Sequence, residues 1–186
     1  MYWCKLKLTY IAALTGGFVL LLGLQSCRPD KTQPNGTLKY FDIAGYFKAD
    51  TSKLQKLNPA VNKTVTHNGI SENKTVHIPN WGQELNLFIQ SDINRPAWKN
   101  SYNVLNTDSL IIYTAKTPDL RTTKIMIRKD NGKVKWLVIF NHTKNLLYET
   151  VEKLSYFPDS AYQIAKSQHV KLMGKNLYVV KGVLKK

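Results

Sequence analysis

The stretch TTKIMIRKDNGKVKWLVIFN, residues 122–141, decides the fold of this chain. Its centre, Asn131-Gly132, is the strongest short signal for a two-residue hairpin turn, because both central positions of such a turn adopt positive φ. The runs on either side are rich in β-branched and large apolar residues and contain no proline. The stretch therefore predicts two antiparallel strands joined by a tight turn.

The hydrophobic pattern around this turn selects a register. A two-residue loop makes one face of the hairpin almost wholly apolar, whereas a three-residue loop over 130–132 would mix lysine and isoleucine on both faces. The two-residue loop is therefore preferred. It predicts the pairs Ile127–Trp136, Ile125–Val138 and Thr123–Phe140.

The opposite face of the predicted hairpin mixes basic and apolar side chains. Its members are Lys124, Met126, Arg128, Lys135, Leu137 and Ile139. Such a face would suit a shallow site for an amphipathic anion. It would equally suit a sheet surface on which lysine and arginine stems lie over apolar neighbours.

Outward from this hairpin, the C-terminal half alternates with period two between turn signals. Candidate strands are 102–106, 109–116, 121–129, 134–141, 144–155, 160–172 and 177–184. No helical unit separates them, so they predict an antiparallel meander of about six to seven strands.

The N-terminal half predicts two helices and a second hairpin. Residues 38–57 read as an amphipathic helix, 61–78 as a hairpin around Asn68-Gly69, and Asn80 as the N-cap of another helix. The predicted fold is thus α+β: a helix, a β-hairpin, a second helix, and a curved meander packed on the helices. This architecture looks loosely like the half-open barrels of periplasmic lipoprotein carriers, and like cone-shaped sheets that grip a helix.

The first 27 residues carry the clearest functional signal. Lys5 and Lys7 precede an uncharged run from Leu8 to Leu24, whose most apolar part is 18–22. This is the layout of a secretory signal peptide, and the run is short for a spanning helix. The tetrapeptide Leu24-Gln25-Ser26-Cys27 resembles the lipobox of bacterial lipoproteins, with Gln25 larger than the usual small residue.

The resemblance implies a processing route. Cleavage between Ser26 and Cys27 would release the signal peptide 1–26, and Cys27 would carry the acyl chains. Residues 27–37 then form a tether and 38–186 a single α+β domain. Two or more acyl chains anchor a protein stably, whereas one binds only marginally. Cleavage would also remove Cys4, which leaves no partner for an internal disulfide.

The net charge bears on the choice of partner, although a basic surface that is merely solvated would also explain it. The 186-residue chain has a formal net charge of +15, and loss of Lys5 and Lys7 with the signal peptide leaves +13. A strongly basic domain favours phosphate-rich partners, here anionic lipid or another envelope polyanion. An exported lipoprotein rarely meets nucleic acid. We expect attachment to the cell envelope, at an outer membrane and facing the periplasm.

The sequence carries no motif for catalysis or metal binding. It contains no G-x-S-x-G, no H-E-x-x-H and no glycine-rich phosphate loop, and the lone His142 is predicted in a turn. We therefore predict no catalytic residues, metal or cofactor. The preferred hypothesis is non-catalytic binding or scaffolding at the membrane. The alternative is a carrier or sensor of an amphipathic anion, which an apolar internal cavity would favour and a solid core would disfavour.

Overall fold

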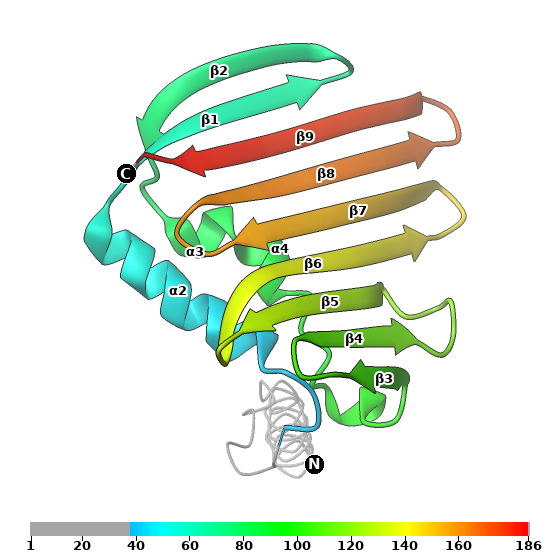
Figure 1. Ribbon diagram of the computed structural model, residues 1–186. Helices are drawn as coiled ribbons and strands as arrows, with labels where there is room; N and C mark the ends of the chain where they lie inside the picture. The colour runs from blue at the N-terminus through cyan, green and yellow to red at the C-terminus, as the bar shows by residue number, and fades with distance from the viewer. Residues whose placement is uncertain (1–37, 186) are drawn as a thin grey trace, which may run out of the picture. The chain divides into compact units, whose positions relative to one another are not determined.

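A large antiparallel sheet dominates the chain (Figure 1). The structure is a computed structural model that describes residues 38–185, so the predicted signal peptide, Cys27 and the predicted tether lie outside the described residues. The strands are β1 (Ala60–His67), β2 (Ile70–His77), β3 (Tyr102–Asn106), β4 (Leu110–Ala115), β5 (Thr122–Asp130), β6 (Lys133–Lys144), β7 (Tyr148–Phe157), β8 (Ala161–Val170) and β9 (Gly174–Leu184). Their order across the sheet is β2-β1-β9-β8-β7-β6-β5-β4-β3.

The predicted meander is confirmed as the run β3 to β9, and the predicted N-terminal hairpin as β1–β2. The prediction did not join the two. In the structure β1 pairs antiparallel with β9, with Val61 opposite Leu184, so the sheet has nine strands. This pairing joins segments more than 100 residues apart, which no local pattern specifies.

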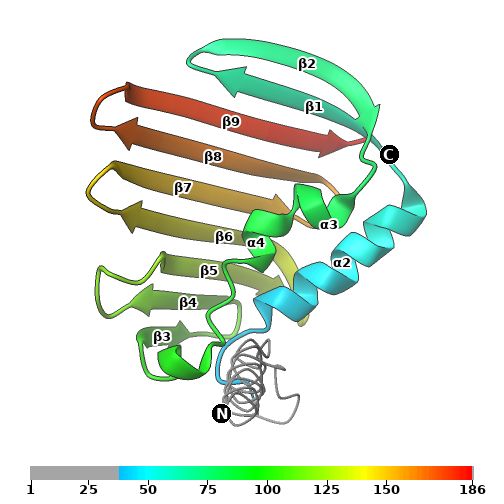
Figure 2. The ribbon, with the colours of Figure 1, turned by 180° about the vertical axis from the view of Figure 1, so that it is seen from behind.

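The helices form one layer on one side of the sheet. Their bounds are Ile43–Leu57 for α2, Trp81–Glu84 for α3 and Asn86–Ile89 for α4, and a 3₁₀ turn η2 spans Pro96–Trp98. Figures 1 and 2, seen from opposite sides, show α2, α3 and α4 behind the sheet in one view and in front of it in the other.

Capping residues set where these helices begin. The side chain of Asp42 accepts a hydrogen bond from the amide of Gly45, so α2 starts at Ile43 rather than at the predicted residue 38. Asn80 caps α3 through the amide of Gln83, as predicted. Within residues 38–185, none of the helices has the length and apolarity needed to cross a bilayer.

Aromatic side chains fill the space between the helices and the sheet. Phe47 of α2 lies between Phe88 and Tyr156, with ring centroids 4.9 and 5.0 Å apart. Trp81 of α3 packs edge-on against Tyr162 of β8 at 6.0 Å. These five side chains are at most 2% exposed, so the interior here is packed rather than hollow.

The predicted register of the β5–β6 hairpin holds only near its turn. Asp130 pairs with Lys133, which matches the two-residue loop, and Asn131 and Gly132 both have positive φ. A register shift after Arg128 then places Ile127 opposite Leu137 instead of Trp136. The extra residue in β6 forms a β-bulge. Every later residue of β6 therefore lies on the opposite face of the sheet from the one predicted.

The bulge reassigns two predicted surface residues. Leu137 and Ile139 lie on the core face with Ile125 and Ile127, and all four are fully buried. The prediction that Leu137 and Ile139 share a face with Lys124, Met126 and Arg128 is therefore wrong. Its cause is the bulge, which leaves no clear mark in a hydrophobic pattern that is apolar on both faces.

The connection between β6 and β7 also differs from the prediction. His142 belongs to β6 and not to a turn, since β6 continues to Lys144. The turn follows at 145–147, where the side chain of Asn145 accepts hydrogen bonds from the amides of Leu147 and Tyr148. This Asx-type turn exposes Leu146 and Leu147, which the prediction had placed inside a strand.

Candidate binding surface

The side of the sheet away from α2, α3 and α4 is not covered by any described helix, and we call it the outer face. Strand pairing identifies its residues, because side chains alternate between faces. Two adjacent cross-strand rows run over β4 to β7. They are Ile112–Met126–Val138–Ser155 and Thr114–Lys124–Phe140–Lys153.

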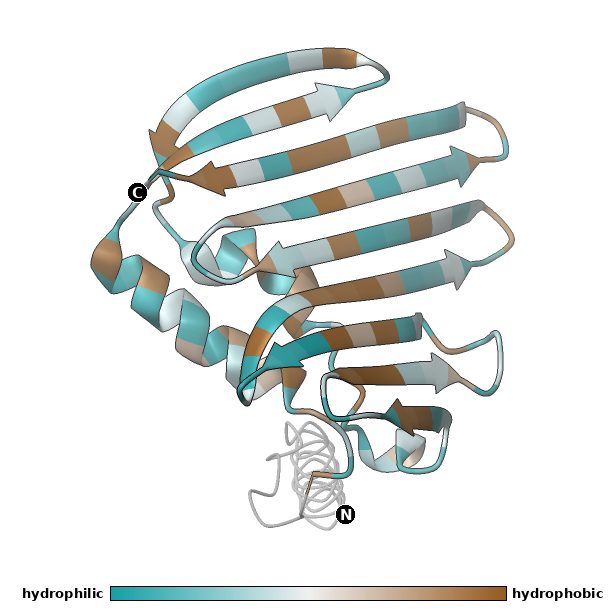
Figure 3. Cartoon of the chain, viewed as in Figure 1, coloured by the Kyte–Doolittle hydropathy of each residue, from teal (hydrophilic) through white to brown (hydrophobic). Residues whose placement is uncertain are grey.

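These rows combine apolar groups with basic ones. Arg128 lies beside them, opposite Trp136 on β6 and Leu110 on β4. The Nζ of Lys153 lies 5.9 Å from the centroid of the Phe140 ring, within range of a cation–π contact. Figure 3 shows hydrophobic segments on β4, β5 and β6, which include the core residues of these strands as well as those of the outer face, whereas β2 is mostly hydrophilic.

The basic groups of this surface are not neutralised by neighbours. Among the ion pairs of residues 38–185, none involves Lys124, Arg128 or Lys153. Lys124 is partly buried, which fits an aliphatic stem lying over apolar neighbours with its ammonium group in solvent. The outer face therefore presents an apolar centre with free positive charge.

The structure keeps part of the face predicted from sequence. Lys124, Met126 and Arg128 lie on the outer face, and Lys135 is exposed next to the bulge. Trp136, Val138 and Phe140 take the places expected for Leu137 and Ile139. Sequence reasoning missed these three because it assigned them to the buried side of the hairpin.

Two buried tyrosines bind carboxylates and attach the helices to the sheet. The hydroxyl of Tyr162 donates to Glu84 of α3 at 2.5 Å, and Lys63 of β1 lies 2.7 Å from the same carboxylate. The hydroxyl of Tyr156 donates to Asp50 of α2. Burial, followed by the nearby carboxylate, raises the pKa of both tyrosines well above the usual range. They therefore stay neutral and act as fixed donors.

A third buried polar group joins the sheet to the segment after α4. Glu152 of β7 is 6% exposed and accepts hydrogen bonds from Arg121 at 3.3 Å and Asn141 at 3.2 Å. The Nδ2 of Asn141 also lies 2.9 Å from the hydroxyl of Ser91. This network satisfies a buried charge and positions Ser91, so its role is structural.

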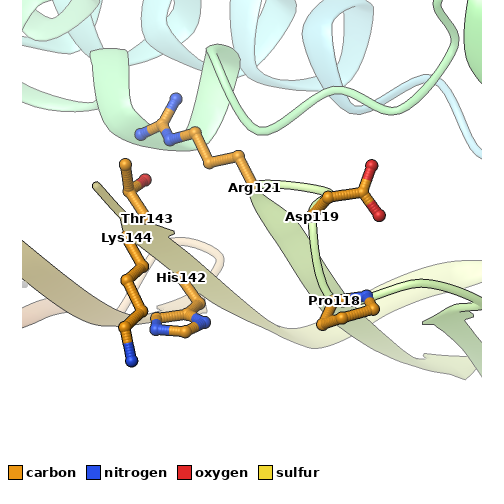
Figure 4. Close-up of a pocket in the computed structure, with 6 residues that line it drawn as sticks. All are labelled: Pro118, Asp119, Arg121, His142, Thr143 and Lys144. Carbon is orange, nitrogen blue, oxygen red and sulfur yellow. The ribbon is translucent and has the colours of Figure 1, made fainter. Parts of the chain in front are cut away.

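One pocket lies at the β4–β5 connection and has a volume of about 410 Å³. It is open to solvent and lined by Pro118, Asp119, Arg121, His142, Thr143 and Lys144. Figure 4 shows Arg121 pointing toward the helices, while His142 and Lys144 point to the opposite side of the sheet. The titratable groups diverge, so the pocket does not form a catalytic constellation.

His142 has a partner that the sequence did not suggest. Its Nε2 lies 2.8 Å from Glu149 on the neighbouring strand β7, and Lys144 lies 3.9 Å from the same carboxylate. The hydrogen bond from His142 lowers the pKa of Glu149, with a smaller effect from Lys144. The spacing of seven residues across a short turn could have indicated this pair.

A second pocket, of about 340 Å³, lies between α3 and the core faces of β1, β8 and β9. Lys63 and Glu84 line it and bind each other. No group of three or more His, Cys, Asp or Glu side chains in residues 38–185 is arranged to hold a metal ion.

Comparison of the chain with family models, curated proteins and solved structures finds no match.

Proposed function

We propose that this chain is a lipid-anchored protein of the cell envelope that acts by binding, without catalysis, through the outer face of its sheet. Acylated Cys27 would hold it at the outer membrane, with the domain in the periplasm. The observation that carries the binding role is the outer face itself: a helix-free sheet surface on which Phe140, Val138 and Met126 lie among unpaired basic groups.

The anchor is supported by the order of features in residues 1–37. A basic start, an apolar run, the lipobox Leu24–Cys27 and a proline-containing segment follow one another as in lipoprotein precursors. The tether of 11 residues, 27–37, reaches at most about 40 Å when fully extended. The domain would therefore work close to the bilayer surface.

The packed interior favours this proposal over an internal carrier. A ligand held between the sheet and the helices would have to displace Phe47, Trp81 or Tyr162, which are fully buried there. The two pockets described above are both open to solvent. The alternative that keeps the predicted ligand class is an amphipathic anion, such as a single lipid, bound on the outer face.

Fatty-acid labelling tests the anchor. In bacteria grown with radiolabelled palmitate, we expect the wild type to take up label and to fractionate with membranes, and Cys27→Ala to do neither. Cys4→Ala is the matched control, because Cys4 precedes the expected cleavage site and should not change labelling. Unlabelled wild-type protein would show that the lipobox interpretation is wrong.

Amide chemical-shift mapping tests the outer face. We would titrate residues 27–186, with Cys27→Ser, with lysophosphatidylglycerol below its critical micelle concentration. The expected shifts centre on β5 and β6 and are lost in Lys124→Glu/Lys153→Glu. Lys48→Glu/Lys56→Glu, on the exposed side of α2, serves as the charge-matched control. Shifts centred on buried residues of α3 and β8 would instead support the carrier.

A further inference from the structure

The most exposed apolar side chains of the described chain all lie at one end of the sheet. Five large hydrophobic residues are more than 70% exposed: Ile70, Leu146, Leu147, Leu172 and Met173. They belong to the turns after β1, β6 and β8. These three strands run parallel to one another in the sheet order, so their turns emerge at the same end (Figure 1). We call residues 68–70, 145–147 and 171–173 the tip row.

Hydrogen bonds hold the tips beside one another. The amide of Lys171 donates to the carbonyl of Leu147 at 3.1 Å, which ties the β8–β9 turn to the β6–β7 turn. At the β1–β2 turn, Asn68 donates from its amide to the carbonyl of Leu177 and accepts from the amide of the same residue. The β6–β7 and β8–β9 turns are therefore joined directly, and the β1–β2 turn is joined to strand β9.

Basic residues surround these apolar tips. Lys144, Lys171 and Lys175 are exposed within two residues of the two leucine-bearing turns. Glu149 is the one acid equally close to these turns, and Lys144 lies 3.9 Å from its carboxylate, so these four residues have a net charge of +2. At the next connection on this end of the sheet, Lys116 and Asp119 balance each other in charge. The two leucine-bearing turns are thus apolar at their most exposed points and positive directly behind them, whereas Glu72 follows Ile70 at the β1–β2 turn.

This arrangement matches the cross-section of a bilayer surface that contains anionic lipids. Exposed leucine and methionine side chains reach the acyl region, while lysines a few ångströms behind them remain among the headgroup phosphates. Exposed apolar residues of this size cost solubility in a protein that keeps them in water, which argues for a surface that covers them. The alternation of charge and apolar surface favours a membrane over an apolar protein groove.

We propose that the tip row is a membrane-docking site that inserts Leu146, Leu147, Leu172 and Met173 into an anionic bilayer. The site is separate from the outer face. The docking proposal rests on the proposed function in one respect, which is that the protein is located at a membrane. A lipid on Cys27 would fix only one point of the chain, whereas the tip row would give the domain a defined orientation. Because the tether holds the domain within about 40 Å, even weak docking would be populated.

Vesicle sedimentation of an unacylated chain tests the proposal independently of the anchor. Residues 27–186 with Cys27→Ser lack the signal peptide, and the core of the domain lies wholly between Tyr40 and Leu184. We expect this protein to bind phosphatidylcholine vesicles that contain 30% phosphatidylglycerol, and to bind pure phosphatidylcholine vesicles at least tenfold more weakly. Each of the substitutions Lys144→Gln, Lys171→Gln and Lys175→Gln should weaken binding about fivefold.

The apolar tips are tested by serine substitution. The variant Leu146→Ser/Leu147→Ser/Leu172→Ser/Met173→Ser should bind the anionic vesicles at least tenfold more weakly, with an unchanged circular dichroism spectrum. Leu57→Ser/Leu105→Ser is the matched control, since both leucines are more than half exposed but lie away from the tip row. This control should bind like the parent protein.

Insertion itself can be measured, because residues 27–186 with Cys27→Ser contain no other cysteine. An environment-sensitive fluorophore on Leu172→Cys should shift to the blue on vesicle binding and be quenched by lipids brominated in their acyl chains. The same fluorophore on Leu57→Cys should do neither.

Three results would overturn the proposal. They are no binding of the unacylated chain to anionic vesicles at low salt, full binding by the tip variant, and a tip-dependent dimer in sedimentation velocity that does not bind vesicles. None of them bears on fatty-acid labelling of Cys27. A failure of labelling would, in turn, leave the vesicle results standing, so the two proposals can be separated.

Discussion

Gly182 of β9 is the glycine at which the packing of the core can be tested most sharply. A Cβ added there would lie 2.2 Å from Cε1 of Tyr162, well inside the distance that carbon atoms tolerate. The Tyr162 ring is fully buried against Trp81, so it has no free space to move into. We therefore expect Gly182→Ala to destabilise the domain although alanine is normally better than glycine in a strand.

The magnitude follows from three contributions. Overpacking a filled core costs about 1–3 kcal/mol. Displacing Tyr162 also weakens its hydrogen bond to Glu84, which is charge-assisted and contributes about 1.5–3 kcal/mol. Alanine lowers the entropy of the unfolded chain relative to glycine, which offsets about 0.5–1 kcal/mol of this loss. The expected net loss is about 3 kcal/mol, or a fall in Tm of about 6–12 °C for a domain of this size.

Urea unfolding of residues 27–186, followed by tryptophan fluorescence, gives the free energies. A double-mutant cycle isolates the clash. In a Tyr162→Ala background the ring is gone, so Gly182→Ala should become neutral or slightly stabilising. Tyr162→Phe measures the hydrogen bond alone, because it keeps the ring in place. Equal costs of Gly182→Ala in the wild-type and Tyr162→Ala backgrounds would refute the packing argument.

Three further outcomes can be checked on the same protein. Burial raises the pKa of five tyrosines, that of Tyr102 to about 12. The five are Tyr46, Tyr102, Tyr113, Tyr156 and Tyr162. The neutral tyrosines stabilise the fold below the ordinary tyrosine pKa of about 10, and this stabilisation is lost as pH rises through the folded-state pKa. Absorbance at 295 nm, which reports tyrosine ionisation, should therefore rise together with loss of near-ultraviolet circular dichroism. Reversible titration of every tyrosine near pH 10 in the intact fold would contradict this. The lowered pKa of Glu149 stabilises the fold above the ordinary glutamate pKa, and this stabilisation is lost as pH falls through the folded-state pKa. Carboxyl NMR should show the pKa of Glu149 rising in His142→Ala. An unchanged pKa would exclude the His142–Glu149 pair. Gly132 has φ of +76° at the β5–β6 turn, so Gly132→Ala should cost about 1 kcal/mol in urea unfolding, and a stabilising effect would be inconsistent with the turn.

Local signals were sufficient for most of the secondary structure. Asn68-Gly69 and Asn131-Gly132 both form the two-residue turns predicted for them, with positive φ at all four positions. Asn80 caps a helix because its side chain reaches the amide of Gln83, an interaction within four residues. Such features are encoded by neighbouring residues, so a single sequence reveals them.

Long-range pairing and irregular backbone were not encoded in this way. The pairing of β1 with β9 joins residues more than 100 positions apart, and neither strand carries a local signal for its partner. The bulge in β6 could not be found because Trp136-Leu137-Val138-Ile139-Phe140 is apolar at every position, so either face could have been buried. This register shift of one residue decides which side chains of β6 lie on the outer face.

The tip row was missed for a related physical reason. The predicted strands 144–155 and 160–172 included Leu146, Leu147 and Leu172, because apolar residues usually mark buried chain. The two turns each carry a pair of large apolar residues in succession, which a half-buried strand with period two does not require. Asn145 directly before the first pair is the turn signal that could have located it. Exposing large apolar side chains at a turn costs free energy in water. The pattern becomes informative once a lipid bilayer is considered as the surroundings of these turns.

The two proposed surfaces impose a geometry on one another. If the tips after β1, β6 and β8 insert into a bilayer, these strands stand steeply to the membrane plane, because each turn is the end of its strand. The normal to a sheet is perpendicular to its strands, so the outer face would then point sideways, along the membrane surface. A partner for Phe140 and Lys124 would accordingly have to be held at the same membrane. A ligand that reaches the outer face only from bulk solvent, with the tips inserted, would be at odds with this arrangement.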